Sequence, residues 1–359
     1  MRFGKTLAAA SATVLAIGAL AGCSSGGSGS GGGSANNSDA VFNSGQIEVL
    51  KVHDQINEHL KGKRIAFVPL LYKGYPLTEN WGTTLERTAN ESGAEFKVYD
   101  ANFSPDRMVS TMNDLIARKA ADVIIVQNQA AGLLDNAIEQ ARKAGIYTIV
   151  LNMMTTKLGD AFIGVNVYSA AKAVTERAMS DCQARPDARQ LVAIDGSGTD
   201  PASVQWAAGV KEAAAAKGFN VTVNHSGFQN PAAQQAAESS IAQHQSKLCG
   251  FVVTFDMNAV TVGQTVKTAE QRGTLRPGEV GTYTLDANYQ TCDAIKAGTV
   301  TATSAYDVQG IGASAAIAMQ NLLLGGIKPG GQHNFAFATN TLVDKANVDT
   351  TSIACYHSK

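Results

Sequence analysis

Six histidines could bind a metal or act as general bases, but their spacing builds neither kind of site. None is followed four residues later by a second histidine, and the sequence contains no His-Glu-x-x-His. The stretch Asp195-Gly-Ser-Gly does not complete a G-x-S-x-G elbow, and no phosphate-binding loop is present. The sequence therefore indicates no enzyme, no metal and no cofactor, and scattered surface positions explain the histidines: His53, His59, His225, His244, His333 and His357.

The thiol of Cys23 lies in surroundings that predict a chemical modification. Arg2 and Lys5 precede an apolar run over residues 7–20, which is too short for a permanent membrane span and is typical of a secretory signal. The following Leu20-Ala-Gly-Cys23 resembles a bacterial lipobox. We therefore expect a signal peptide over residues 1–22, and a lipidated Cys23 with a Ser/Gly-rich tether over residues 23–40. The alternative is an ordinary signal peptide with a chance cysteine.

The charge balance limits the classes of partner that this protein can bind, and the cysteine content indicates the compartment in which it works. The 29 basic and 30 acidic residues nearly cancel, and no basic cluster follows the signal, which argues against nucleic acid as a partner. We expect an extracytoplasmic monomer that is attached to the membrane only through the lipid anchor. The remaining cysteines form an even set suited to an oxidising compartment and predict two disulfides in one of three connectivities: Cys182, Cys249, Cys292 and Cys355.

Short β-rich runs alternate with longer helical patterns along the rest of the chain, which is typical of parallel sheets covered by helices. After a helix at 46–60, the first series predicts strands at 64–69, 95–99, 123–127, 147–151 and 161–164, with helices at 81–92, 104–118 and 133–144. The second series predicts helices at 168–182, 202–216, 232–244 and 260–271, with strands at 190–195, 220–225, 250–255 and 280–285. The expected fold class is α/β, with two doubly wound parallel-sheet lobes and a ligand site at the carboxyl ends of the strands.

Several local matches accompany this order of elements: Pro76 before a helix, Asp286-Ala-Asn, Ala294-Ile-Lys-Ala-Gly298, and Gly310-x-Gly312 before an Ala-rich helix. With them, residues 63–341 resemble the type I periplasmic binding proteins of the ribose-binding group, which share their lobes with LacI-type sugar regulators. Members of that group serve ABC importers. The resemblance implies an ABC permease and a separate cytoplasmic ATPase as partners, since this chain has no phosphate-binding loop.

The resemblance also implies a domain map with a three-strand hinge. The chain would cross between lobes near residues 164–167, 306–308 and 335–338. The N-terminal lobe would comprise residues 41–165 plus 307–336, and the C-terminal lobe residues 166–306 plus 337–359. All four remaining cysteines then lie in the C-terminal lobe, and this map favours the pairs Cys182–Cys249 and Cys292–Cys355.

Carried over by position, the resemblance implies a set of ligand-binding residues in the cleft between the lobes. Phe228 falls where an aromatic ring stacks on a sugar, and Asp286 where a carboxylate accepts hydroxyl hydrogen bonds. The full set is Leu77, Thr78, Gln127, Gln129, Asn152, Met153, Trp206, Phe228, Phe255, Asp256, Asp286 and Tyr306.

Four residues in this set depart from the ribose-binding pattern. Asn152-Met153 replaces an Asp-Arg pair, Trp206 replaces a second arginine, and Phe255 replaces an asparagine. The departures favour a ligand with fewer hydroxyls or an apolar face, because unpaired buried polar groups cost roughly 1–3 kcal/mol each. Small polyols, deoxy sugars and ring-bearing compounds remain open.

Several of these residues also have plain structural interpretations. Trp206 and Phe255 could be core packing, and Asp286 and Asp256 could cap helices. Trp81 is expected to pack under the preceding loop, whose Tyr72, Lys73 and Tyr75 either cover the cleft mouth or lie on the surface. An aromatic cluster with carboxylates also suits a cationic amine, because an ammonium group over an aromatic face gains ~0.5–2 kcal/mol.

The sequence thus predicts a lipid-anchored solute-binding protein that closes on a small hydroxylated ligand, a sugar or polyol, and presents it to an ABC permease. A sensor of the same fold, feeding a chemoreceptor or sensor kinase, is the first alternative, and a binder of an aromatic or amine ligand is another. A secreted α/β hydrolase is disfavoured by the missing nucleophile motif. A DNA-binding regulator is disfavoured by the export signal.

Overall fold

The computed structural model describes residues 44–357, with side chains from residue 49 onward. The predicted signal peptide, the lipidation site Cys23 and the tether lie outside these residues. The described residues from Leu50 onward form one compact unit that contains both sheets. Within residues 44–357, no helix combines the length and apolar character needed to cross a bilayer.

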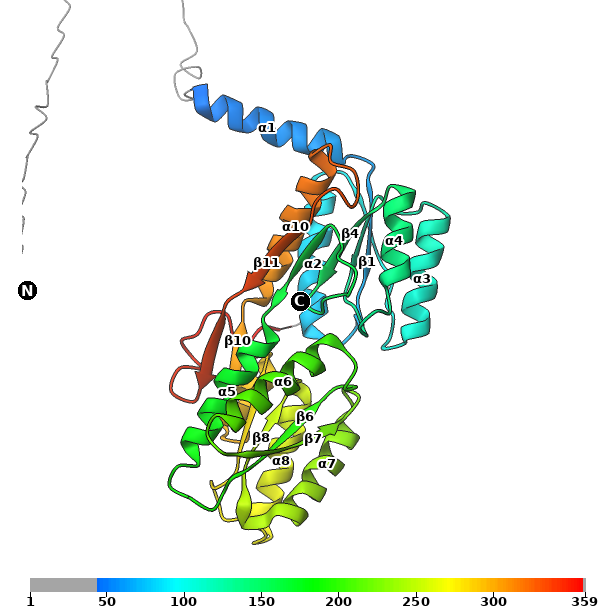
Figure 1. Ribbon diagram of the computed structural model, residues 1–359. Coiled ribbons are helices and arrows are strands. Elements are labelled where there is room, and N and C mark those ends of the chain that lie inside the picture. Colours follow the sequence, from blue (N-terminus) through cyan, green and yellow to red (C-terminus); the bar gives the residue numbers. More distant parts are fainter. Residues whose placement is uncertain (1–43, 358–359) are drawn as a thin grey trace, which may run out of the picture. The chain divides into compact units, whose positions relative to one another are not determined.

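The first sheet contains six parallel strands in the order β11-β5-β4-β3-β1-β2. Helices α2 and α10 pack together on one face and α3 and α4 on the other, as Figure 1 shows. We call this sheet and its helices the N-terminal lobe. Its strands are β1 (Arg64–Val68), β2 (Glu95–Val98), β3 (Val123–Val126), β4 (Tyr147–Leu151), β5 (Ala161–Val165) and β11 (Asn334–Ala338). Its helices are α2 (Pro76–Glu91), α3 (Pro105–Ala117), α4 (Asp135–Ala144) and α10 (Val308–Leu324), and α1 (Ser44–Leu60) precedes β1.

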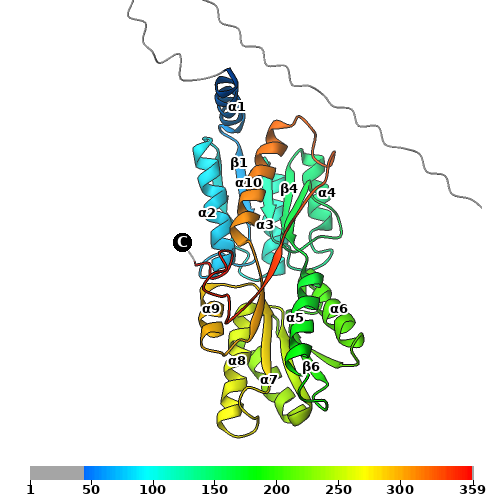
Figure 2. The ribbon, with the colours of Figure 1, turned by 90° about the vertical axis from the view of Figure 1, so that its left-hand side faces the viewer.

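The second sheet has the order β12-β10-β9-β8-β6-β7, and only β12 is antiparallel to its neighbour. Helices α5 and α6 pack on one face and α7 and α8 on the other (Figure 2). This sheet and its helices form the C-terminal lobe. Its strands are β6 (Gln190–Asp195), β7 (Asn220–His225), β8 (Leu248–Val253), β9 (Gly281–Leu285), β10 (Ala302–Tyr306) and β12 (Asn340–Asp344). Its helices are α5 (Val167–Asp181), α6 (Pro201–Ala215), α7 (Asn230–His244), α8 (Asp256–Gln271) and α9 (Tyr289–Lys296).

The predicted fold class of two parallel-sheet lobes is confirmed. Every residue of the central strands β3 and β8 is buried, as expected for strands covered by helices on both faces. The chain changes sheets three times, at Asn166, Asp307 and Thr339, as the expected three-strand hinge requires. Asn166 and Asp307 each cap the helix that follows, so two of the crossings lead directly into α5 and α10.

Two helices begin four or more residues earlier than the sequence pattern predicted. Helix α2 begins at Pro76 rather than at residue 81, and helix α8 begins at Asp256 rather than at residue 260. Proline suits the first helical position because its missing N–H would have no partner there. The first turns, Pro76-Leu-Thr-Glu and Asp256-Met-Asn-Ala, mix polar and apolar residues, so apolar periodicity alone did not predict where these helices begin. As a result, Thr78 and Asp256 lie in helices, directly after the loops that carry site residues.

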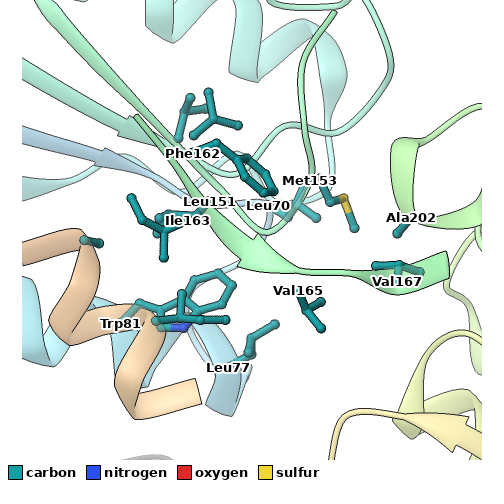
Figure 3. Packing of buried hydrophobic residues seen from close by; sticks show 14 of the residues in the cluster. Leu70, Leu77, Trp81, Leu151, Met153, Phe162, Ile163, Val165, Val167 and Ala202 are labelled. Atoms are coloured by element: carbon teal, nitrogen blue, oxygen red, sulfur yellow. The ribbon is translucent and has the colours of Figure 1, made fainter. Parts of the chain in front are cut away.

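A hydrophobic cluster is continuous through the first crossing between the lobes. Figure 3 shows the chain passing from Ile163 through Val165 to Val167, with Trp81 on one side and Met153 on the other. The indole N–H of Trp81 donates to the Val308 carbonyl oxygen at 3.1 Å, next to the second crossing. Buried residues therefore flank the first two crossings, whereas Thr339 at the third crossing is exposed.

Both disulfides lie in the C-terminal lobe. Cys182 at the end of α5 is bonded to Cys249 in β8, and Cys292 in α9 is bonded to Cys355 near the C-terminus. These are the two pairs that the domain map favoured. The second disulfide fixes the C-terminal segment beside α9, where Cys355 N–H donates to the Ala287 carbonyl oxygen at 2.7 Å.

Candidate functional site

The candidate site lies where the carboxyl ends of the two sheets meet. In open α/β sheets these ends carry the loops that bind ligands. In the N-terminal lobe, Gln127 follows β3 and Asn152 follows β4. In the C-terminal lobe, Asp286 follows β9 and Tyr306 ends β10. Asn152 Nδ2 lies 3.5 Å from the Tyr306 hydroxyl oxygen, so the two lobes are in contact here.

Four half-buried aromatic rings form a closed circuit across this contact, and we call them the aromatic quartet. Tyr75 and Phe103 come from the N-terminal lobe, and Phe228 and Phe255 from the C-terminal lobe. Neighbouring ring centroids lie 5.8 Å apart for Tyr75–Phe255, 5.7 Å for Phe255–Phe228, and 6.5 Å for both Phe228–Phe103 and Phe103–Tyr75. The arrangement presents apolar ring faces from both lobes to one place.

Local backbone structure holds two of these rings in position. A Cβ atom at Gly196 would lie 2.1 Å from Phe228 Cζ, so only glycine lets the Phe228 ring lie over the end of β6. The Phe103 N–H donates to the Leu70 carbonyl oxygen at 2.7 Å, and its carbonyl oxygen accepts from Gln129 Nε2 at 2.7 Å. Gln129 therefore positions Phe103 rather than presenting its amide N–H to the site.

Unusual backbone conformations gather at this site. Eight non-glycine residues in the described part of the chain have positive φ, and four of them are Phe103 (54°), Asn152 (60°), Phe228 (62°) and Asp286 (72°). Each such conformation costs of order 1–3 kcal/mol and persists where the surrounding structure holds it. Four of these strained backbone conformations lie at the candidate site, and such clustering is typical of functional sites.

Two buried carboxylates lie behind the strand ends of the C-terminal lobe. Asp256 is 1% exposed, and its Oδ2 accepts hydrogen bonds from the Asn288 N–H and the Thr291 hydroxyl, each at 3.1 Å. Asp286 is 6% exposed, and its Oδ1 has no hydrogen-bond partner within the protein. Asn288 caps α9 through its own side chain, so Asp286 caps no helix. Of the two, Asp286 holds the free acceptor.

Hydroxyl groups surround Asp286. The hydroxyl of the buried Tyr306 lies close enough to the Asp286 carboxylate for each group to shift the pKa of the other. The buried Tyr356 comes from the C-terminal segment, one residue after Cys355. Asn152 belongs to the N-terminal lobe, and its Nδ2 contacts the Tyr306 hydroxyl oxygen. The Asn152 Oδ1 is buried and has no hydrogen-bond partner. Free acceptors on Asp286 and Asn152 and a hydroxyl between them suit a ligand with several hydrogen-bond donors.

Burial and mutual repulsion shift the protonation of these groups. Burial raises the pKa of Asp256 to about 6, although its hydrogen bonds from Asn288 and Thr291 act against the shift. Burial, and then the nearby Asp256 charge, raise the pKa of Asp286 well above its usual range. Burial and the two carboxylates also raise the pKa of Tyr75, Tyr306 and Tyr356, which keeps these hydroxyls neutral. The site thus disfavours two negative charges at once.

The N-terminal lobe contributes amides. Gln127 Oε1 accepts from the Leu70 N–H at 3.3 Å, and its buried Nε2 has no partner. Asn128 Nδ2 donates to the Met154 carbonyl oxygen at 3.1 Å, and its Oδ1 is unpaired. The Thr78 hydroxyl donates to the Leu71 carbonyl oxygen at 2.5 Å, which fixes the loop that carries Tyr75. Thr78 therefore positions the loop that carries Tyr75, and its hydroxyl is already used in this hydrogen bond.

Three of the expected ligand-binding residues are placed in the core instead. Trp206 is completely buried in α6, and its indole N–H donates to the Val252 carbonyl oxygen at 3.2 Å. Leu77 and Met153 belong to the hydrophobic cluster at the first crossing (Figure 3). The family resemblance suggested these residues by their position along the chain, but the structure buries their side chains among hydrophobic residues. The structure groups Phe228, Phe255, Asp286, Tyr306 and Asn152, with Asp256 beside them.

Sequence reasoning missed Phe103, Asn128 and Tyr356. Phe103 lies between the end of β2 and the Ser104 cap of α3, a loop position at a strand end that could have been recognised. Tyr356 is held at the site by the Cys292–Cys355 disulfide and by the Tyr289 N–H, which donates to its carbonyl oxygen at 3.0 Å, and both partners are far away in sequence. Tyr75, considered as either a cleft cover or a surface residue, lies in the aromatic quartet. Within residues 49–357, no three metal-ligating side chains gather into a site.

Comparison with known proteins places this geometry in a family. A family model described as a periplasmic binding protein domain matches residues 65–327, which is more than half of the chain. No curated protein sequence matches the chain.

Solved structures share the fold over most of the chain. An ABC transporter solute-binding protein from Burkholderia graminis, in complex with D-arabinose, has a TM-score of 0.70 and 17% identity and covers 81% of this chain and 98% of its own. One from Agrobacterium vitis, bound with α-D-tagatopyranose, has a TM-score of 0.70 and 20% identity and covers 82% and 99%. One from Mycobacterium smegmatis, with bound glycerol, has a TM-score of 0.70 and 19% identity and covers 82% and 100%.

The family match covers the strands of both sheets except β11 and β12, together with the loops that carry the aromatic quartet and the carboxylates. The family is one of binding proteins rather than enzymes, as the missing catalytic motifs led us to expect. With its two parallel-sheet lobes and triple crossing, the chain belongs to the periplasmic binding protein domain family and has the type I fold of the group it was found to resemble.

Proposed function

We propose that this protein is a lipid-anchored, extracytoplasmic solute-binding protein. In this proposal the lobes close on a small hydroxylated ligand, and the closed form delivers the ligand to an ABC import permease. The observation that carries the proposal is the free Oδ1 of the buried Asp286, which lies at the strand ends where the aromatic quartet joins the two lobes.

Hinge closure follows from the way the quartet is divided between the lobes. Each lobe supplies two rings, and Tyr75–Phe255 and Phe103–Phe228 are the pairs that cross between lobes. A ligand that touches both halves binds the closed form more tightly and so shifts the population toward it. A ligand that touched one lobe alone would not drive closure.

A sugar or polyol fits the chemistry of these side chains. Ring faces cover the apolar face of a sugar, and the Asp286 carboxyl and the amides of Gln127 and Asn152 offer partners for hydroxyl groups. The similar structures were solved with D-arabinose, tagatopyranose and glycerol, all of them hydroxylated.

Thermal unfolding with a panel of pentoses, hexoses, deoxy sugars and polyols tests the ligand class. A ligand at 100 times its dissociation constant adds ~2.7 kcal/mol to the free energy of unfolding, enough to raise the melting temperature visibly. We expect a selective shift that Phe228→Ala removes. Phe335→Ala is the matched control, because Phe335 lies on β11 outside the quartet and is 50% exposed. A panel without any shift contradicts the proposed ligand class.

The lipid anchor and the delivery step need tests of their own. The sequence Leu20-Ala-Gly-Cys23 supports the anchor, and Cys23→Ser should abolish incorporation of a labelled fatty acid and release the protein from membranes. For delivery, deletion of the gene should reduce uptake of the identified ligand. Unchanged uptake together with a lost response to that ligand would instead identify a sensor.

A further inference from the structure

Asp286 is a buried carboxylate without a basic partner. No ion pair among residues 49–357 involves Asp286 or Asp256. The charge that acts on Asp286 is that of Asp256, which is negative and therefore repulsive. A buried charge is stable only when it is paired and hydrogen-bonded, so an ionised Asp286 requires a positive partner from outside the protein.

Asp256 differs from Asp286 because the protein itself compensates its charge. It stands in the first turn of α8, where the helix dipole favours a negative group, and it accepts from the Asn288 N–H and the Thr291 hydroxyl. Asp256 is thus a structural carboxylate that joins the starts of α8 and α9. A single carboxylate, Asp286, is left for a ligand.

The rings of the quartet are also free of cations. Within the described part of the chain, lysine or arginine groups lie over the rings of Tyr99, Tyr168 and Phe219, and none lies over a quartet ring. An ammonium group held against Tyr or Phe faces gains ~0.5–2 kcal/mol. The aromatic quartet and the Asp286 carboxylate therefore both favour a ligand with a positively charged ammonium group.

We propose that the ligand carries one ammonium group beside its hydroxyls, and that Asp286 and the aromatic quartet bind this group. The inference rests on the proposed function and narrows its ligand class to amino sugars and amino polyols. The amides of Gln127 and Asn152 remain for the hydroxyls.

Matched pairs of ligands test the inference by titration calorimetry on the full chain at pH 7. The pairs are D-glucosamine with D-glucose, D-galactosamine with D-galactose, and 1-amino-1-deoxy-D-sorbitol with D-sorbitol. In at least one pair we expect the amine to bind at least tenfold more tightly than its neutral partner. Asp286→Asn keeps the shape of the side chain and should reduce that preference to about twofold or less.

Asp195→Asn is the matched control for Asp286→Asn. Asp195 is also buried at a strand end, but it has the His225 ring as its own partner at 2.5 Å, so its loss should leave the amine preference intact. A neutral partner that binds as tightly as its amine overturns the inference and leaves the proposed function standing. If no member of any pair binds, both the inference and the proposed sugar or polyol class are wrong.

Discussion

The two lobes contribute different chemistry to the same site. The C-terminal lobe supplies both buried carboxylates, Asp256 and Asp286, and the N-terminal lobe supplies the amides of Gln127, Asn128 and Asn152. The aromatic quartet alone is shared equally. The difference indicates that the C-terminal lobe orients the ligand through charge, and that the N-terminal lobe completes the site when the lobes meet.

The lobes also differ in how they are held together. Both disulfides lie in the C-terminal lobe, and one of them fixes the segment that carries Tyr356. The described cysteines are all in this lobe, so the N-terminal lobe depends on packing around β1, β3 and Trp81. The disulfides thus reinforce the same lobe that carries the buried carboxylates Asp256 and Asp286.

The largest expected effect comes from the core of the C-terminal lobe. Trp206→Ala should lower the free energy of unfolding by roughly 3–5 kcal/mol, because it removes a completely buried ring and its hydrogen bond to Val252. Denaturant unfolding measures the loss, and the order of ligand affinities should stay unchanged. A changed ligand preference without a loss of stability would place Trp206 in the site.

The two disulfides provide a matched comparison within one lobe. They close separations of 63 and 67 residues, so replacing either pair by serine should destabilise the protein by about 4 kcal/mol. Loss of Cys292–Cys355 should also weaken ligand binding, because it frees Tyr356. Loss of Cys182–Cys249 should not, because Cys249 lies near the opposite end of its strand from the site. Equal effects on affinity would contradict this difference.

The raised pKa values of the C-terminal lobe predict a pH effect on the unliganded protein. Asp256 titrates near pH 4 when unfolded and at about 6 when folded. The folded state therefore holds more protons between these values, so its stability should fall as pH rises from 4 to 6, and Asp256 contributes at most about 3 kcal/mol to that fall. Asp286 acts in the same direction.

Asp122 in the N-terminal lobe is the control for this pH effect. Its hydrogen bonds and ion pair with Arg64 lower the pKa of its carboxyl, so its contribution to stability is lost only below pH 4. The slope of melting temperature against pH from 4 to 6 should become shallower in Asp256→Asn, where Asp286 alone still contributes, and should be unchanged in Asp122→Asn. An unchanged slope in Asp256→Asn would show that Asp256 is not the titrating group.

The smallest expected effect is in the N-terminal half of the site. Gln129→Ala removes the hydrogen bond to the Phe103 carbonyl oxygen, which is worth about 1 kcal/mol, so ligand affinity should fall by roughly fivefold through misplacement of one ring. Gln234→Ala, on the exposed face of α7, is the control for calorimetry. A Gln129→Ala variant with parental affinity would show that Phe103 holds its position unaided.

Most of the fold could be predicted from the sequence because buried parallel strands such as β3 and β8 are continuous apolar runs between helical patterns. Site residues that directly follow such strands, including Asp286, were proposed from the family resemblance, which assigns them by their position after a strand. Trp206 shows the limit of this reasoning, since a tryptophan in a helix near a strand end can face the core or the cleft. Tyr356 shows another limit, because its place depends on a distant disulfide.

Small-angle X-ray scattering tests most directly whether the two lobes close around a ligand. With a saturating ligand from the panel, the radius of gyration should decrease in the parent protein. In Phe228→Ala, which lacks one ring that crosses between the lobes, the decrease should be smaller or absent. An unchanged radius of gyration in the parent, while calorimetry shows the site to be full, would contradict capture of the ligand between the lobes.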